Sequence, residues 1–115
     1  MDIQEQIADL IKTVIKRSQW AGVFEDVSFF GLDIPNNRVF GDFSSNVAMA
    51  LGRKTKEPAQ EIAVQIRQGL ESELRKSVLA EKIEKIEVKT PGFINFFLSA
   101  SYLYDVLSEI CKRRD

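Results

Sequence analysis

Residues 85–98 read KIEVKTPGFINFFL, and this stretch predicts a β-hairpin. Ile86 and Val88 alternate with charged residues, which is typical of a strand that has one face in water. The tripeptide Thr90-Pro91-Gly92 favours a tight connection. The residues after it are aromatic and aliphatic around a single asparagine. We therefore expect two antiparallel strands joined by this turn.

The second strand of the hairpin has two dissimilar faces, because side chains on a strand point alternately to opposite sides. The wholly apolar face is assigned to the core and consists of Ile94, Phe96 and Leu98. The opposite face carries Phe93, Asn95 and Phe97. A buried face does not normally hold an amide between two aromatic rings without a dedicated partner. We therefore expect Phe93 and Asn95 to lie near solvent.

A solvent-facing ring beside an amide suits one unstacked nucleotide of an RNA loop. Phe93 offers a surface on which a base can stack, and Asn95 offers an amide that can hydrogen-bond a base edge. In the alternative interpretation, Phe93 packs under a loop and Asn95 caps a neighbouring backbone group. The pattern alone leaves both interpretations open.

Outside the hairpin, apolar periodicity predicts helices. One runs from Ile3 to about Trp20 and another from Pro58 to about Ser77, while a last helix opens at Ser99 or Ser101. Residues 27–34 favour an extended segment. The order helix, strand, helices, strand, strand, helix predicts a single α+β domain over residues 1–115, with a small antiparallel sheet covered by helices on one face.

The segment GDFSSN at residues 41–46 precedes a short apolar run that predicts a helix from Val47. Asp42 or Ser44 is the expected helix cap. The alternative is an anion-binding nest, but Asp42 supplies its own negative charge and no phosphate-loop spacing is present. Arg53, Lys54 and Lys56 follow this helix, where they are either solvated or in contact with RNA phosphates.

Composition excludes several classes of function. The chain has no histidine, the residue that dominates acid–base catalysis, catalytic triads and zinc sites, so we expect neither an autonomous enzyme nor a metal site. One cysteine cannot form an internal disulfide, which fits a reduced cytoplasmic protein. The chain has no apolar run long enough to span a membrane, so we expect no membrane partner. The net charge of -1 requires any contact with nucleic acid to be local.

Two of these stretches together resemble the amino-terminal additional domain of arginyl-tRNA synthetases. Residues 41–51, GDFSSNVAMAL, with Pro58 and Ile62-Ala63 after them, look like the family's Gly-Asp-aromatic-x-Ser-Asn-x-Ala segment. Residues 91–96, PGFINF, look like its Pro-Gly-aromatic-aliphatic-Asn-Phe hairpin. The resemblance covers nearly the whole chain. The motif positions that it implies to be structural are Gly41, Asp42, Ser45, Asn46, Pro91 and Gly92.

The resemblance implies a domain that touches the outer corner of arginine tRNA, where the D-loop and T-loop meet. In that family an aromatic and a polar residue two positions apart contact a D-loop base, and these carry over to Phe93 and Asn95. Arg53, Lys54 and Lys89 are further candidates for RNA contact. Gly52-Arg53 and Lys89-Thr90 depart from the family's usual residues at these positions.

The resemblance also implies that the chemistry lies elsewhere. The parent enzyme is expected to join arginine to tRNA with ATP and magnesium, through class I signatures that need histidine, in a catalytic domain outside these 115 residues. This chain is therefore expected to bind no cofactor. Its expected partners are arginine tRNA and the parent's own catalytic domain. The competing hypothesis is a protein-interaction module that docks through Phe93, Phe97 and an exposed sheet edge.

Overall fold

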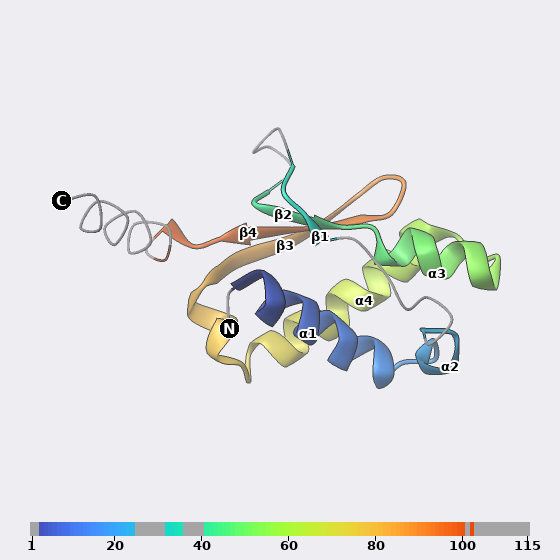
Figure 1. Ribbon diagram of the computed structural model, residues 1–115, viewed down its shortest axis with the longest axis horizontal. Helices are drawn as coiled ribbons and strands as arrows, with labels where there is room; N and C mark the ends of the chain where they lie inside the picture. The colour runs from blue at the N-terminus through green and yellow to red at the C-terminus, as the bar shows by residue number, and fades with distance from the viewer. Residues whose placement is uncertain (1–2, 25–31, 36–40, 101, 103–115) are drawn as a thin grey trace.

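The computed structural model describes residues 3–24, 32–35, 41–100 and 102. In this part of the chain an antiparallel sheet forms one layer and helices form the other, so the predicted two-layer α+β fold is confirmed (Figure 1). The strands are β1 Leu32–Asp33, β2 Phe43–Ser45, β3 Ile83–Lys89 and β4 Phe93–Leu98, and their order in the sheet is β1-β2-β4-β3. The predicted hairpin is therefore β3–β4.

The helices lie on one face of this sheet (Figure 1). They are α1 Ile3–Lys16, α2 Ala21–Phe24, α3 Val47–Thr55 and α4 Ala59–Leu74, with a 3-10 turn η2 at Val78–Glu81. The apolar stripes of α1 and α4 face the core together with β4. On β4 the core residues are Ile94, Phe96 and Leu98, as the sequence predicted. The face of the sheet turned away from these helices is called the outer face below.

Helix α1 ends at Lys16, earlier than the predicted Trp20. The Ser18 hydroxyl donates to the carbonyl of Ile15, which satisfies an acceptor at the helix end. The chain then turns, and the buried Trp20 donates its indole N–H to Glu57 Oε1 at 3.3 Å, beyond the end of α3. Trp20 thus links two helical segments instead of continuing the first one.

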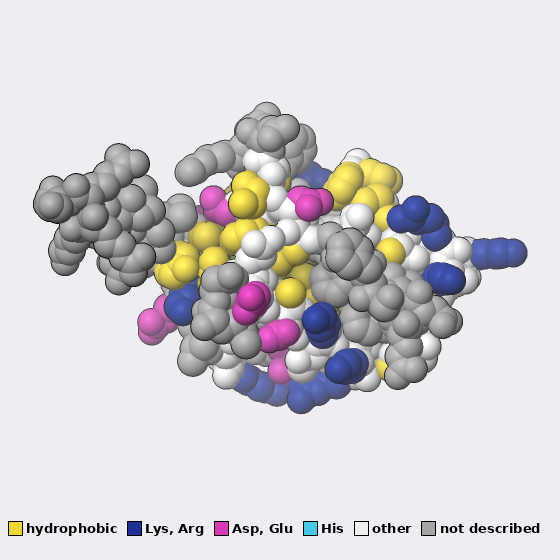
Figure 2. Space-filling model, viewed as in Figure 1, with side chains coloured by type: hydrophobic (Ala, Val, Ile, Leu, Met, Phe, Trp, Pro, Cys, Tyr) yellow, Lys and Arg dark blue, Asp and Glu magenta, His cyan; other side chains and the backbone are white. Residues whose placement is uncertain are grey.

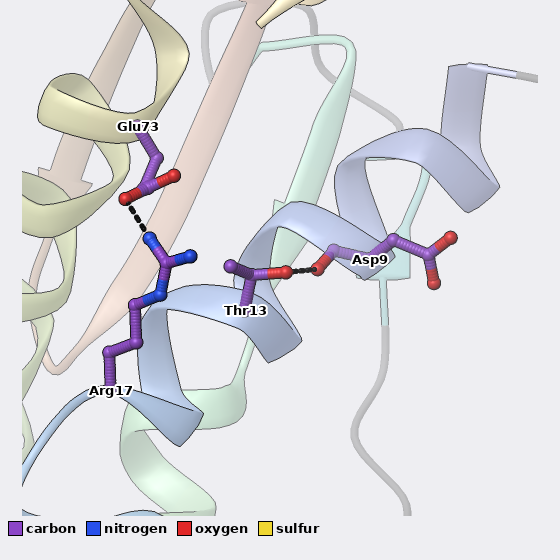
Figure 3. A network of polar contacts seen from close by, with 4 residues as sticks. All are labelled: Asp9, Thr13, Arg17 and Glu73. Carbon is purple, nitrogen blue, oxygen red and sulfur yellow. Dashed lines mark hydrogen bonds and ion pairs between the residues drawn. The ribbon is translucent and has the colours of Figure 1, made fainter. Parts of the chain in front are cut away.

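An ion pair also joins the carboxyl end of α1 to α4. In Figure 3 the Arg17 guanidinium reaches Glu73, and one turn earlier the Thr13 hydroxyl donates to the backbone carbonyl of Asp9 at 3.0 Å. Helix α4 ends three residues before the predicted Ser77. The Ser77 hydroxyl instead accepts from the amide of Leu79 and caps η2.

The prediction that Asp42 or Ser44 caps the helix after residue 46 is wrong. Residues 41–46 contain strand β2, and neither side chain caps α3. The amide of Asp42 donates to the Phe96 carbonyl, and its carboxylate accepts from the Leu98 amide, both at 2.9 Å. Asp42 therefore extends the pairing of β2 with β4. Ser44 points to Asn95, and the group near the start of α3 is the Ser45 hydroxyl, which accepts from the Val47 amide.

Several predictions fall wholly or partly outside the described residues. Of the extended stretch at 27–34, the structure describes residues 32–34, with the strand at Leu32–Asp33. The last helix is described at Ala100 and Tyr102, where the Ser99 hydroxyl accepts from the Tyr102 amide at 3.2 Å, as expected of a cap. Cys111 lies outside the described part.

Candidate nucleic-acid interface

The outer face of the hairpin sets charged side chains against β4. The register places Lys85 opposite Phe97, Glu87 opposite Asn95, and Lys89 opposite Phe93. Residues directly opposite each other in antiparallel strands share a face and interact. Lys85 Nζ lies 4.5 Å from the centroid of the Phe97 ring and 3.1 Å from Glu87 Oε1. Lys85 therefore already contacts the Phe97 ring and the Glu87 carboxylate. Phe93 lies at the other end of β4, beside the turn.

One row of polar side chains crosses the middle of the outer face. From strand to strand it runs Asp33, Ser44, Asn95 and Glu87. Within the row, Ser44 Oγ donates to Asn95 Oδ1 at 2.7 Å. Asn95 Nδ2 is buried and has no hydrogen-bond partner among the residues that the structure describes. We call Asn95 Nδ2 the open donor.

The expectation that Phe93 and Asn95 both lie near solvent is half right. The side chain of Phe93 is 37% exposed, but that of Asn95 is only 1% exposed. Asn95 lies in the middle of the sheet with β2 on one side and β3 on the other, while Phe93 begins β4 at the turn. The alternation of side chains along a strand predicts which face of the sheet a side chain lies on. It does not predict how much the neighbouring strands bury that side chain. The hydrogen-bond partner of the Asn95 side chain among the described residues is the Ser44 hydroxyl, so the alternative of a backbone cap is also wrong.

A depression of about 540 Å³ opens on the outer face over this amide. Its described lining consists of Asp33, Pro35, Ser44, Asn46, Met49, Lys89, Thr90, Phe93 and Asn95. Sites for small ligands fall in the range of roughly 300–1,000 Å³ and combine apolar walls with a few fixed polar groups. Among the lining residues, Asn95 brings an amide, Phe93 an aromatic ring and Lys89 a positive charge. The depression can take one planar polar group.

The basic candidates are placed unequally. Lys89 lines the depression itself. Met49 lines the depression and also a second, shallower hollow that includes Arg53, so Arg53 lies one side chain away. Lys54 is exposed on the same helix but belongs to neither described lining. Figure 2 shows Lys and Arg side chains gathered over the end of the molecule where α3 lies.

The hairpin turn positions Lys89 and Phe93 on either side of it, and both residues line the depression. The amide of Gly92 donates to the Lys89 carbonyl at 2.9 Å, and a cis peptide bond joins Thr90 to Pro91. A Cβ atom on Gly92 would lie 2.8 Å from Cβ of Ala59, so the turn packs directly on the first residue of α4. Gly92 therefore leaves no room for a side chain between the turn and α4.

Two negative findings apply to the described ranges alone. No group of three or more His, Cys, Asp or Glu side chains is arranged there to hold a metal ion. No helix among those residues has the length and apolar character needed to cross a membrane.

Comparison with known proteins agrees with this fold and motif set. The family described as "Arginyl tRNA synthetase N terminal domain" matches residues 2–98. The chain belongs to this family. The resemblance seen in the sequence is thereby confirmed, and this arginyl-tRNA synthetase N-terminal domain is, as expected, not itself the catalytic part of such an enzyme.

Relatives of the domain are much longer proteins named arginine–tRNA ligase. The protein from Staphylococcus carnosus is 36% identical over 114 residues, which cover 98% of this chain and 20% of the relative. The protein from Thermotoga petrophila is 36% identical over 93 residues, 81% of this chain and 16% of the relative. That from Acetivibrio thermocellus is 30% identical, covering 98% and 19%. The chain thus spans about a fifth of the length of these relatives or less.

Sequence reasoning missed several side chains that line the synthetase domain's depression, among them Asp33, Ser44 and Met49. The sequence predicts Ser44 as a candidate cap of the following helix, within a segment whose alternative is an anion-binding nest. If residues 43–45 are taken as a strand, alternation places Phe43 and Ser45 toward the core and Ser44 on the outer face. The signal was present, but three residues are too few to be identified as a strand by pattern.

Proposed function

We propose that this domain contacts an unpaired base in the D-loop at the outer corner of arginine tRNA, and so aids ATP-dependent arginylation by a longer parent enzyme. The observation that carries the proposal is the open donor on Asn95, buried at the depression and next to the half-exposed ring of Phe93. A buried amide without a partner is unfavourable by about 1–3 kcal/mol. A ligand that accepts its hydrogen bond removes that penalty.

A nucleobase matches the chemistry of the depression. Base–aromatic stacking contributes about 1–3 kcal/mol and tolerates any base, because every base has a π-face. Phe93 can supply that platform, and the amide of Asn95 can read a base edge. A base held by stacking and by one buried hydrogen bond must be unpaired, which favours a loop over a duplex stem.

Phosphate contacts supplement the base contact. Lys89 lines the depression, and Arg53 lies beyond Met49, with Lys54 on the same helix. The net charge of -1 limits this electrostatic contribution. The isolated domain therefore binds RNA weakly, and the rest of the parent enzyme supplies most of the affinity for the phosphate backbone.

The chemical step belongs to other parts of the parent. ATP and magnesium bind outside these residues, in the catalytic domain with which this domain associates. The parent acts in the cytoplasm in protein biosynthesis.

The test is a nitrogen-15 NMR titration of the chain with a D-arm hairpin from an arginine tRNA and with an unrelated hairpin, at low and physiological salt. We expect the signals of Phe93, Asn95 and residues 41–46 to shift selectively with the D-arm. Asn95→Ala abolishes the preference, whereas Gln68→Ala, which removes an exposed amide on α4, leaves it intact. If neither hairpin moves these signals, the proposal fails.

A second candidate is a protein-interaction module. It is favoured by Ile34, which is 71% exposed and lies next to Pro35 at the depression, and by β3, which forms an edge of the sheet. Apolar side chains near an open sheet edge suit a peptide partner. Binding to protein that is insensitive to salt, with no response to RNA, supports this function instead of the first.

A further inference from the structure

Ser44 holds one end of the Asn95 amide. The two residues are paired across β2 and β4, and their side chains share the outer face. A primary amide has an acceptor oxygen at one end and a donor nitrogen at the other. Because the Ser44 hydroxyl donates to Oδ1 at 2.7 Å, the acceptor end is occupied and the donor end remains. Both residues line the depression.

The rest of the row supports this orientation of the amide. Glu87 lies on the opposite side of Asn95 from Ser44, and its carboxylate is held by Lys85 at 3.1 Å. An ionised carboxylate only accepts hydrogen bonds. An amide placed between a hydroxyl and a carboxylate is more stable with its oxygen toward the hydroxyl, because the reverse orientation directs its oxygen toward negative charge. No hydrogen bond joins Asn95 Nδ2 to Glu87, so the donor stays without a partner among the described residues.

We propose that Ser44 is a positioning residue that sets the hydrogen-bonding polarity of the depression, so that Asn95 presents a donor and takes an acceptor atom of an unpaired base. The acceptor is an unprotonated ring nitrogen or a carbonyl oxygen. This inference rests on the proposed function and adds to it the chemical class of the atom that is read. Ser44 itself acts through Asn95.

The matched variants at this position are Ser44→Ala and Ser44→Thr. Alanine removes the hydroxyl and frees the amide to present either end, whereas threonine keeps the hydroxyl and suits a strand. Ser44 is only half-buried, so water can replace a lost contact, and we expect both variants to fold. Thermal unfolding of each variant checks this expectation.

The probe is the D-arm hairpin, made chemically with atomic substitutions. The loop base that matters is first located by replacing each loop nucleotide with an abasic one. Its acceptor atoms are then removed singly, a ring nitrogen becoming C–H and a carbonyl oxygen becoming hydrogen. The measured quantity is the ratio of the affinities for the parent and the substituted hairpin, because a ratio cancels general changes in RNA binding.

For the unmodified chain we expect removal of one acceptor atom to lower affinity about threefold to tenfold, the range for one hydrogen bond. The same removal has no effect on Asn95→Ala. In Ser44→Ala the ratio falls toward one, and in Ser44→Thr it is retained. A merely structural Ser44 would change both affinities equally and leave the ratio untouched.

Three results overturn the inference in different ways. If Ser44→Ala keeps the full ratio, Ser44 does not position the amide. If the unmodified chain binds the D-arm but no acceptor atom matters, Asn95 does not act as a donor, while the proposed function stands. If the unmodified chain binds no hairpin, the proposed function itself fails and the inference fails with it.

Discussion

A buried amide nitrogen without a partner opposes folding, and Asn95 Nδ2 is such a group among the described residues. Apart from Ser45, the other fully buried side chains among the described residues are apolar, for example Ile94 and Phe96 on the same strand. An apolar residue at position 95 could fill the same space without the unsatisfied donor. We therefore infer that the Asn95 amide serves ligand binding and does not stabilise the fold.

Asn95→Leu is expected to separate binding from stability. Leucine has the same branched arrangement of side-chain heavy atoms as asparagine and no polar group to desolvate, so the free energy of unfolding should stay level or rise by about 1 kcal/mol. RNA preference should disappear. Urea denaturation of both chains measures the stability, and the hairpin titration measures the preference. A loss of stability above about 2 kcal/mol would show that the amide is structural after all.

For single residues, the sequence predicts which face of the sheet a side chain lies on better than it predicts how exposed that side chain is. The alternation along residues 93–98 correctly separates the core side chains from the outer ones, since it depends only on strand geometry. The burial of Asn95 depends on strands β2 and β3 at its sides, and their arrangement is not a local property. Phe93, at the end of its strand, is covered less and was predicted correctly.

Among the elements, the hairpin and the long helices were predictable because their periodicity extends over many residues. Strand β2 was not, because it has three residues and a composition typical of helix caps. Pairing with β4 overrides that local preference. The Asp42 carboxylate, which could have capped α3, accepts instead from the Leu98 amide at the far end of β4.

Gly41 is expected to be essential to this β2–β4 pairing. Its φ is +93°, which favours glycine, and an added Cβ would lie 2.8 Å from the Phe96 carbonyl oxygen. Gly41→Ala should therefore lower the free energy of unfolding by about 1–3 kcal/mol. Gly22→Ala is the matched control, because nothing lies within 4 Å of its added Cβ. Thermal unfolding compares the two, and equal stability would rule out strain at Gly41.

In the molecule as a whole, the helices cover one face of the sheet and leave the other face without a helical layer. The helices bury the apolar side of β4, so its other side can hold polar and aromatic groups that a sheet covered on both faces could not expose. Lysines lie in both layers: Lys89 lines the depression on the outer face, whereas Lys12 lies exposed on α1 in the helical layer. A near-neutral domain can therefore carry a local basic contact.

This division predicts how binding depends on salt. Each phosphate that a cation neutralises contributes about 0.7–0.9 to the slope of log affinity against log salt. Lys89→Ala should reduce the slope by about that amount and weaken the D-arm and unrelated hairpins alike, because a phosphate contact carries no sequence information. Lys12→Ala should change neither affinity nor slope. Titrations at several salt concentrations measure both variants. An unchanged slope for Lys89→Ala would mean that Lys89 contacts no phosphate, and the base contact at Phe93 and Asn95 would then have to account for binding by itself.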